Sequence, residues 1–179
     1  MIKRDNVRVC VPRYLQIGKG SLNELPEIIK ILGSINSLLI VTDKQMVKFG
    51  YVKKLQEVLS KEGIKSDVFD DTVPDPTDTV VLNGINFLDK CKNDAVIGFG
   101  GGSPIDTAKA IAAMAKYSKN IQDYKPPSMF DKKGLPIIAI PTTAGTGSEV
   151  THHAVIIDSN NNEKISCRGE GFVLSLIHI

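Results

Sequence analysis

In Ala95-Val-Ile-Gly-Phe-Gly-Gly-Gly-Ser-Pro-Ile-Asp-Thr-Ala-Lys109, an apolar strand runs through three consecutive glycines directly into a helix. Glycine has no Cβ, so Gly100, Gly101 and Gly102 permit positive φ angles and the close approach of a ligand to the backbone. Pro104 suits the first turn of a helix, whose exposed N–H groups and positive dipole end attract anions. The stretch therefore predicts a strand, a turn and a helix that together hold a phosphate group.

The glycine turn departs from the two common phosphate-binding signatures. Ser103 stands where the dinucleotide fingerprint G-x-G-x-x-G has its last glycine. A P-loop requires Gly-Lys-Ser/Thr, but Pro104 follows Ser103 and the next lysine is Lys109. These departures disfavour a kinase or an ATPase, and an ordinary strand-to-helix turn remains the alternative to a phosphate site.

The composition favours one soluble domain. The chain has 179 residues, of which 42% are hydrophobic, and its formal net charge is +2. No apolar run approaches the roughly 20 residues that a bilayer requires. The charges are spread along the sequence, so they form no basic stripe for nucleic acid. We therefore expect neither a membrane nor a nucleic acid as a partner.

The cysteines indicate a reducing compartment. Cys10, Cys91 and Cys167 are odd in number, widely separated and in no C-x-x-C pair. This pattern is typical of reduced thiols rather than of a disulfide framework. The first residues contain no long apolar segment, so we read no secretory signal and expect a cytoplasmic protein.

Strand-like and helix-like segments alternate along the chain, with short turns between them. After an extended piece at 13–17, strands are predicted at 37–42, 64–69, 94–99, 135–140 and 151–157, and helices at 22–32, 47–61, 77–88 and 104–116. Ser21 is expected to cap the first helix, and 118–134 is expected to be irregular. The order predicts an α/β fold, with an open, mostly parallel sheet flanked by helices.

The informative loops all follow the carboxyl ends of predicted strands, where ligands bind in open parallel sheets. They contain Asp43, Asp75, the glycine turn and the small-residue segment 141–148. A carboxylate after a strand can bind a ribose diol and repel a 2′-phosphate, so Asp43 favours NAD over NADP. The alternative for Asp43 is an exposed turn residue or a helix cap.

Two motifs together resemble the iron-containing, or group III, alcohol dehydrogenases: Gly100-Gly-Gly-Ser-Pro-Ile-Asp-Thr-Ala-Lys109 and Ile140-Pro-Thr-Thr-Ala-Gly-Thr-Gly-Ser-Glu-Val150. The likeness includes Leu39-Ile-Val-Thr-Asp43 and Val73-Pro-Asp-Pro-Thr77 and covers roughly residues 13 to 168. It implies a Rossmann-like N-terminal domain of the dehydroquinate synthase-like fold. The corresponding enzymes have two domains and are similar to lactaldehyde and propanediol oxidoreductases.

The resemblance also implies a set of cofactor-binding residues. Gly101, Gly102 and Ser103 would hold the pyrophosphate, with Asp106 in the same turn. Asp43 would contact the adenosine ribose and Lys164 the nicotinamide-side ribose. The remaining residues implied in this way are Asp75, which stands where many relatives have Asn, and Thr142, Thr143 and Thr146, for which a Ser/Thr turn bonded to its own backbone is the alternative.

In the same family, an Asp and three His of a helical C-terminal domain hold a divalent metal, usually iron. We expect this chain to stop before that domain, because it contains no Asp-x-x-x-His pair. Glu149 and His153 are four residues apart, but a metal site would need a third protein ligand, so no metal-binding residue is predicted. We prefer His153 as a side chain facing a cleft, with His152 packed or exposed.

The domain is predicted to occupy residues 1–168. Residues 169–179 are interpreted as a truncated or non-native tail, because Val173-Leu-Ser-Leu-Ile-His-Ile179 is apolar and nothing follows to bury it.

The sequence thus predicts the cofactor-binding half of an NAD(P)-dependent, metal-dependent alcohol dehydrogenase, with NAD favoured over NADP, inactive as a fragment and with a small alcohol or aldehyde as substrate. A non-catalytic nucleotide-binding module is one alternative. A glycerol dehydrogenase or dehydroquinate synthase-like sibling is another. No catalytic residue is assigned, and a homo-oligomer of the full-length parent is left open.

Overall fold

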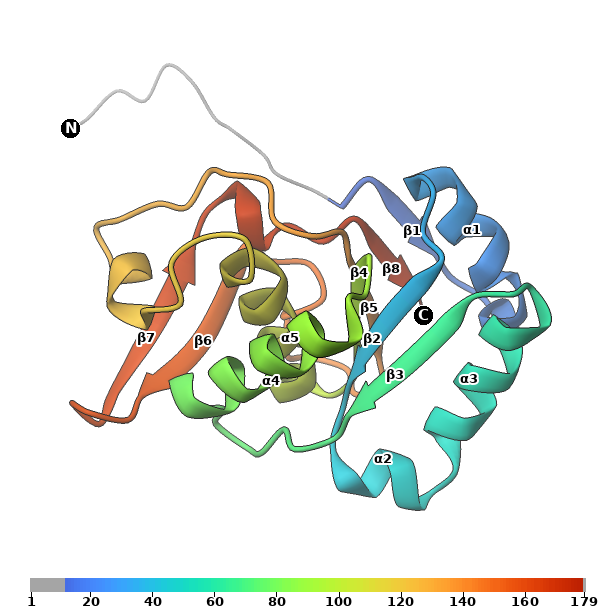
Figure 1. Cartoon of the computed structure of the whole chain (residues 1–179), viewed down its shortest axis with the longest axis horizontal. Helices are drawn as coiled ribbons and strands as arrows, with labels where there is room; N and C mark the ends of the chain where they lie inside the picture. Colours follow the sequence, from blue (N-terminus) through green and yellow to red (C-terminus); the bar gives the residue numbers. More distant parts are fainter. Residues whose placement is uncertain (1–11, 179) are drawn as a thin grey trace.

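A computed structural model describes residues 12–178 and contains a six-stranded parallel sheet (Figure 1). The strands run in the spatial order β1-β8-β5-β4-β2-β3, and every neighbouring pair is parallel. Their bounds are β1 Tyr14–Gln16, β2 Ser37–Val41, β3 Lys65–Phe69, β4 Ala95–Gly100, β5 Ile137–Pro141 and β8 Leu176–His178. The predicted open α/β architecture is confirmed.

Helices cover both faces of the sheet. One face carries α1 and α3 and the other carries α4 and α5 (Figure 1). The α-helices are α1 Leu25–Leu32, α2 Lys44–Lys48, α3 Tyr51–Lys61, α4 Asp78–Cys91 and α5 Gly102–Met114, and the short 3-10 turns are η1 Ser21–Glu24, η2 Ile121–Tyr124 and η3 Glu170–Phe172. No helix within residues 12–178 has both the length and the apolar character needed to cross a membrane.

The central strands are apolar on both faces, because each face has its own core. In β2, Leu39 and Val41 pack on the α4–α5 side, whereas Leu38 and Ile40 pack on the α1–α3 side. This alternation follows from the two-residue period of a strand. All four side chains are fully buried. The continuous apolar runs seen in the sequence are therefore strands covered by helices on both sides.

A glycine brings α5 close to the middle of the sheet. A Cβ added to Gly98 of β4 would lie 2.9 Å from the Cα of Ile105 and 3.0 Å from the Cβ of Ala108. Such distances leave no room for a side chain, so Gly98 allows the helix to rest directly on the strand. This contact positions the first turn of α5 above the carboxyl end of β4.

Two helices differ from the sequence prediction in where they begin. The helix predicted at 22–32 begins only at Leu25, after the η1 turn, with Glu24 rather than Ser21 as its N-cap. Pro26 stands in its first turn, a position that proline favours. The helix predicted at 47–61 is instead two helices, because Phe49 ends α2 and Gly50, with a φ of 79°, begins α3.

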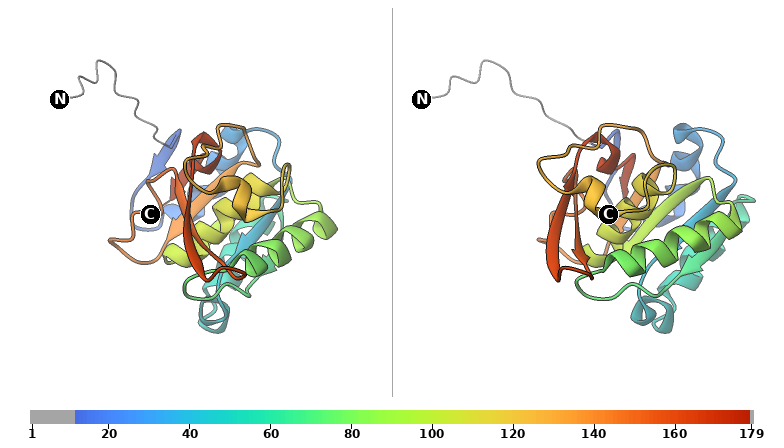
Figure 2. Two further views of the ribbon diagram at one scale, coloured as in Figure 1. Left: turned by 90° about the vertical axis from the view of Figure 1, so that its left-hand side faces the viewer. Right: turned by 60° about the vertical axis from the view of Figure 1, so that its left-hand side comes forward.

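The strand predicted at 151–157 lies outside the parallel sheet. Residues His153–Asp158 form β6, which pairs antiparallel with β7 Glu163–Arg168. Figure 2 shows this hairpin on the side of the molecule that carries α4 and α5. It contacts α5 and the α4 start, and Thr77 forms a bridge with Ile157.

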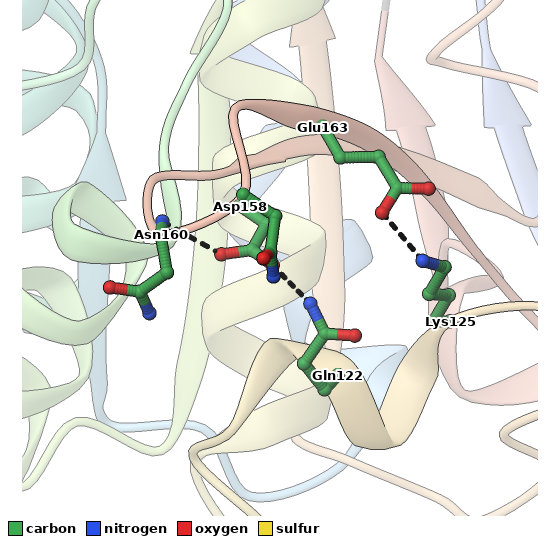
Figure 3. A network of polar contacts seen from close by, with 6 residues as sticks. Gln122, Lys125, Asp158, Asn160 and Glu163 are labelled. Carbon is green, nitrogen blue, oxygen red and sulfur yellow. Dashed lines mark hydrogen bonds and ion pairs between the residues drawn. The ribbon is translucent and has the colours of Figure 1, made fainter.

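The tip of the hairpin is held by a polar network (Figure 3). The carboxylate of Asp158 accepts hydrogen bonds from the side chain of Gln122 and, at 2.9 Å, from the backbone N–H of Asn160. Lys125 forms an ion pair with Glu163 at 2.5 Å. The predicted irregular segment 118–134 thus packs on the hairpin through η2.

The end of the chain takes part in the sheet. Leu176–His178 form β8, which lies between β1 and β5. Leu176, Ile177 and His178 are 0%, 1% and 2% exposed. The apolar character of this segment therefore reflects burial within the sheet, in contrast to the prediction of a tail with nothing to cover it. Residues beyond 168 contribute to the fold of the domain.

Candidate functional site

A pocket of about 590 Å³ opens at the carboxyl edge of the sheet. Loops after β2, β3, β4 and β5 all contribute to it, as expected for an open parallel sheet. Its lining includes six of the residues predicted to bind a cofactor: Asp43, Gly101, Gly102, Ser103, Thr142 and Thr143. The other four predicted residues, Asp75, Asp106, Thr146 and Lys164, do not line this pocket.

The first turn of α5 forms one wall of the pocket. Gly101 is the N-cap residue, and no side chain caps the N–H groups that follow it. A Cβ added to Gly101 would meet no atom closer than 3.4 Å, whereas one added to Gly102 would lie 3.1 Å from Ser148 Oγ. The backbone amides at this turn are therefore available to an anion, which the positive end of the helix dipole also attracts.

Gly100 makes the turn between β4 and α5. Its φ is 143°, a value that side chains rarely tolerate, and an added Cβ would lie 2.9 Å from Pro104 Cγ. Thr142 N donates to Gly100 O at 2.9 Å, which ties the loop after β5 to the glycine turn. The three glycines predicted from the sequence thus serve different purposes, since Gly100 bends the chain, Gly101 leaves space, and Gly102 accommodates Ser148 and Thr146.

Asp43 stands next to the glycine turn and caps a helix. Its Oδ1 accepts hydrogen bonds from Gln45 N at 2.9 Å and Met46 N at 3.0 Å at the start of α2. Its other oxygen lies 3.7 Å from the position a Cβ would take on Gly100. The helix-cap alternative is therefore correct, and Asp43 also belongs to the lining of the pocket, where a ribose is predicted.

The Thr-rich loop divides into two parts. Thr142 and Thr143 line the pocket, and Thr143 Oγ1 lies beside Gly101. Thr146 instead accepts a hydrogen bond from Ser148 N at 3.3 Å and donates to Glu149 at 3.0 Å. The backbone-bonded Ser/Thr turn, which was the alternative interpretation, is found at Thr146.

Asp75 and Lys164 lie together, although the sequence places them 89 positions apart. Their ion pair has a length of 2.6 Å between Nζ and Oδ1, and both side chains are more than half exposed. Asp75 has a φ of 51° in the proline-rich loop, and Lys164 belongs to β7. In this structure, two side chains implied as separate cofactor contacts therefore neutralise each other.

Asp106 and Lys109 are buried on the side of α5 that faces β6. Asp106 accepts a hydrogen bond from Val155 N at 3.0 Å. Lys109 is fully buried, and its ammonium donates to Thr151 O at 2.6 Å and His153 O at 2.9 Å. Burial raises the pKa of Asp106 and lowers the pKa of Lys109 to about 8. These groups fasten the hairpin to α5.

The two adjacent histidines begin β6. Their rings are in edge contact, with centroids 4.3 Å apart. The pKa of His153 is lowered mainly by burial and to a smaller extent by the charge of His152. Within residues 12–178, no group of three or more His, Cys, Asp or Glu side chains has the arrangement of a metal site. Cys10 lies outside the described residues.

Sequence reasoning missed several pocket residues and Lys109. Met46, Phe49, Val73 and Pro74 add an apolar part to the lining, and Asp70 and Asp71 add carboxylates. Val73 and Pro74 belong to the Val73-Pro-Asp-Pro-Thr77 motif of the family resemblance, but no local pattern marks Met46, Phe49, Asp70 or Asp71 as pocket residues. For Lys109 a signal exists, because it stands within the small and apolar run at 108–114, and a lysine buried with such a run requires internal partners.

The chain matches known proteins over nearly its whole length. The sequence profile of the family described as iron-containing alcohol dehydrogenase matches residues 12–177. A lactaldehyde reductase of Escherichia coli strain K12 is 38% identical over 162 residues, which are 89% of this chain and 42% of that protein. The chain therefore spans about two fifths of that relative.

Solved structures agree with this match. A 1,3-propanediol oxidoreductase superimposes with a TM-score of 0.91 at 31% identity, over 96% of this chain and 45% of that one. A sulfoacetaldehyde reductase from Bifidobacterium kashiwanohense, solved in complex with NAD+, gives a TM-score of 0.86 at 32% identity, over 96% of this chain and 45% of that one. The chain belongs to the iron-containing alcohol dehydrogenase family.

Proposed function

We propose that this chain forms the NAD-binding part of a metal-dependent alcohol dehydrogenase, in which hydride passes reversibly between a small alcohol and the nicotinamide ring. Family membership supports the reaction class. The relative solved with NAD+ supports the choice of cofactor. The activity, the substrate, a cytoplasmic location and any homo-oligomer of the whole protein are parts of the proposal.

The single observation that carries the proposal is the uncapped first turn of α5 in the pocket wall. Its N–H groups have no side-chain cap, and Gly101 leaves them open to the pocket. A diphosphate carries two negative charges and several acceptor oxygens, which match these donors. The glycines at 101 and 102 therefore fit the pyrophosphate of a dinucleotide.

The charges around the pocket favour NAD over NADP. Asp43, Asp70 and Asp71 belong to the lining, and Lys44 is paired with Asp71 at 3.2 Å. An additional 2′-phosphate would meet an excess of negative charge at this end of the pocket. An unmodified ribose diol can instead donate hydrogen bonds to the free oxygen of Asp43.

In this proposal the chain binds and orients the cofactor. The amides of α5 would hold the diphosphate, and Asp43 would hold the adenosine ribose. Thr142 and Thr143 would contact neighbouring atoms of the cofactor. Lys164 and Asp75 would border the nicotinamide side, and Asp106 and Lys109 would keep β6 in place. In the family, a divalent metal acts as a Lewis acid on the alcohol oxygen. The described residues offer no group to bind it, so we assign no chemical step to them.

The test is a titration of the isotope-labelled chain with NAD and NADP. We expect the amide resonances of residues 101–103 to shift with NAD and to respond more weakly to NADP. The same preparation should oxidise no alcohol, with iron or zinc added or withheld. Unmoved resonances would contradict cofactor binding. Measurable turnover by these 179 residues would contradict the proposal that the chain only binds and orients the cofactor.

A further inference from the structure

The hairpin of β6 and β7 has one buried face and one open face. Side chains alternate along each strand, so every second residue packs in the core beside α5. The other residues are half-buried or exposed, and the register places them opposite one another in pairs. This open face consists of His153, Val155 and Ile157 of β6 and of Lys164, Ser166 and Arg168 of β7. In the right-hand view of Figure 2 the hairpin forms one margin of the molecule.

The two ends of the open face differ in their charge balance. At one end, Lys164 is paired with Asp75 at 2.6 Å. At the other end, Arg168 stands directly opposite His153. Within residues 12–178, Arg168 forms no ion pair with a carboxylate. The open face therefore carries one uncompensated guanidinium group, at the end away from Lys164.

His153 and Arg168 form the closer of the two types of cross-strand pair. The carbonyl of His153 accepts from Lys109 at 2.9 Å, and the carbonyl of Arg168 accepts from Phe130 N at 2.8 Å. Both carbonyls thus point away from the partner strand. Opposite residues of this type have Cα atoms about 4.5 Å apart, and their side chains lie closer together than in a hydrogen-bonded pair. The imidazole and the guanidinium can therefore reach the same ligand.

The charged groups that act on the His153 ring are all positive. Burial lowers the pKa of His153 most, and three cations lower it further: His152, Arg168 and Lys109. Positive groups that face one another across a sheet are unfavourable unless an anion separates them. A bound anion would relieve this repulsion.

The acidic side chains near this end of the hairpin are engaged elsewhere. Asp106 accepts a hydrogen bond from Val155 N at 3.0 Å and is buried beneath β6. Glu149 accepts a hydrogen bond from Thr146 at 3.0 Å in the loop after β5. The protein thus provides no carboxylate for Arg168, whose planar guanidinium can bind one through two parallel hydrogen bonds.

We propose that Arg168 and His153 bind a carboxylate group of the substrate, so that the alcohol or aldehyde used by the protein is one that also carries a carboxylate. This inference rests on the proposed function. Lys164, implied at the nicotinamide-side ribose, lies on the same face about 13 Å along the strand from Arg168. This separation would leave room for the nicotinamide ring and a substrate of a few carbon atoms. The aliphatic side chains of Val155 and Ile157 suit the apolar part of such a molecule.

The test is a titration of the isotope-labelled, NAD-saturated chain with glycolate and with ethylene glycol. Glycolate has a hydroxyl and a carboxylate group, whereas ethylene glycol has a similar size and no charge. We expect glycolate to shift the Nε–H resonance of Arg168 and the backbone amides of residues 153 and 168. Ethylene glycol should bind at least about tenfold more weakly, because it cannot form a charge-assisted pair.

Substitutions of Arg168 separate its charge from its shape. Arg168→Gln should weaken glycolate about tenfold. Arg168→Lys should recover part of the affinity, because it keeps the charge and loses the planar fork. Lys116→Gln is the matched control, since it removes another exposed cation just after α5, and it should change the affinity less than about twofold. The urea midpoint should stay the same in all three variants, because both residues are exposed.

The outcomes separate this inference from the proposed function. If NAD shifts residues 101–103 and glycolate leaves Arg168 unmoved, the carboxylate site is overturned and the cofactor site stands. Glycolate that displaces NAD would place the anion in the cofactor site and would also overturn the inference. Inorganic phosphate that binds as tightly as glycolate would show an unselective anion site and would overturn the assignment of a carboxylate substrate. A chain that responds to neither NAD nor glycolate would overturn both proposals.

Discussion

Asp75 and Lys164 form an ion pair in which Nζ and Oδ1 are 2.6 Å apart, joining the proline-rich loop after β3 to strand β7. The pair occupies two side chains that the family resemblance implies at the cofactor. A lysine that already has a carboxylate partner is less available to a ribose, since binding must first break that pair. If Lys164 contacts the cofactor as proposed, the pair competes with a bound dinucleotide.

Asp75→Asn should release Lys164. Asn tolerates the positive φ at this position and removes the charge. We expect a higher affinity for NAD, measured by calorimetry, and a change in the free energy of unfolding below about 1 kcal/mol, because exposed ion pairs contribute little. Lys164→Gln is the matched variant and should lower the affinity. A lower affinity for Asp75→Asn would instead place Asp75 itself in contact with the cofactor.

Gly100 and Gly101 should respond differently to alanine. At Gly100, a φ of 143° and a contact of 2.9 Å with Pro104 make any side chain strained. Gly100→Ala should lower the free energy of unfolding by about 1–3 kcal/mol. At Gly101, the nearest atom is 3.4 Å away and the φ is −79°, so the fold should tolerate a methyl group.

Gly101→Ala should nevertheless weaken NAD, because the methyl group would occupy space that a diphosphate needs. Urea unfolding and calorimetry on both variants separate the two effects. Full NAD affinity in a folded Gly101→Ala protein would argue against a diphosphate at this turn.

Asp43 has two roles that substitution can separate. Asn caps helices as well as Asp, whereas Ala loses the cap at a cost of about 1 kcal/mol. Asp43→Asn should therefore keep the stability while raising the ratio of NADP to NAD affinity about tenfold, or ~1.4 kcal/mol. Asp43→Ala should raise the same ratio and also lower the urea midpoint. An unchanged ratio in both variants would remove Asp43 from the ribose.

Lys109 is expected to be critical for stability. Lys109→Met would leave Asp106 buried without a nearby cation and the carbonyls of Thr151 and His153 without a donor. Removing one partner of a buried charged group costs about 3–5 kcal/mol. The control is Lys116→Met, because Lys116 is exposed and lies just after the end of α5. This substitution should change the free energy of unfolding by less than about 0.5 kcal/mol. Equal urea midpoints for the two variants would contradict this role.

The lowered pKa of Lys109 also predicts a pH dependence with a definite sign. Between about pH 8 and pH 10.5 the unfolded chain keeps the proton that the folded chain has lost, so the stability due to Lys109 rises with pH. The slope is at most ~1.4 kcal/mol per pH unit. Burial raises the pKa of Cys167 and of Tyr124 to about 12, which acts in the opposite direction in every variant.

The difference in the free energy of unfolding between the wild-type chain and Lys109→Met cancels these shared contributions. This difference should grow in favour of the wild type from pH 8 to pH 10.5 in urea titrations. A flat or falling difference would show that the folded ammonium keeps its proton.

Local sequence patterns predicted the repeating units of the fold. The apolar runs of β2, β4 and β5, the start of α4 near residue 77 and the glycine turn all depend on neighbouring residues. Strand burial, helix capping and positive φ are short-range properties that a single sequence reveals. The same patterns placed Asp43, the glycines and Thr142–Thr143 at one edge of a sheet, because parallel strands share their carboxyl ends.

Only the tertiary structure decided which distant groups meet. The pairing of Asp75 with Lys164, the burial of Lys109 beneath β6 and the insertion of β8 between β1 and β5 each join segments far apart in the chain. A strand such as Leu176–His178 looks like any short apolar run until its neighbours cover both of its faces. Sequence therefore determined the elements and the edge that holds the site. Packing between elements determined which charges remain free to bind a ligand, because that depends on non-local contacts and desolvation.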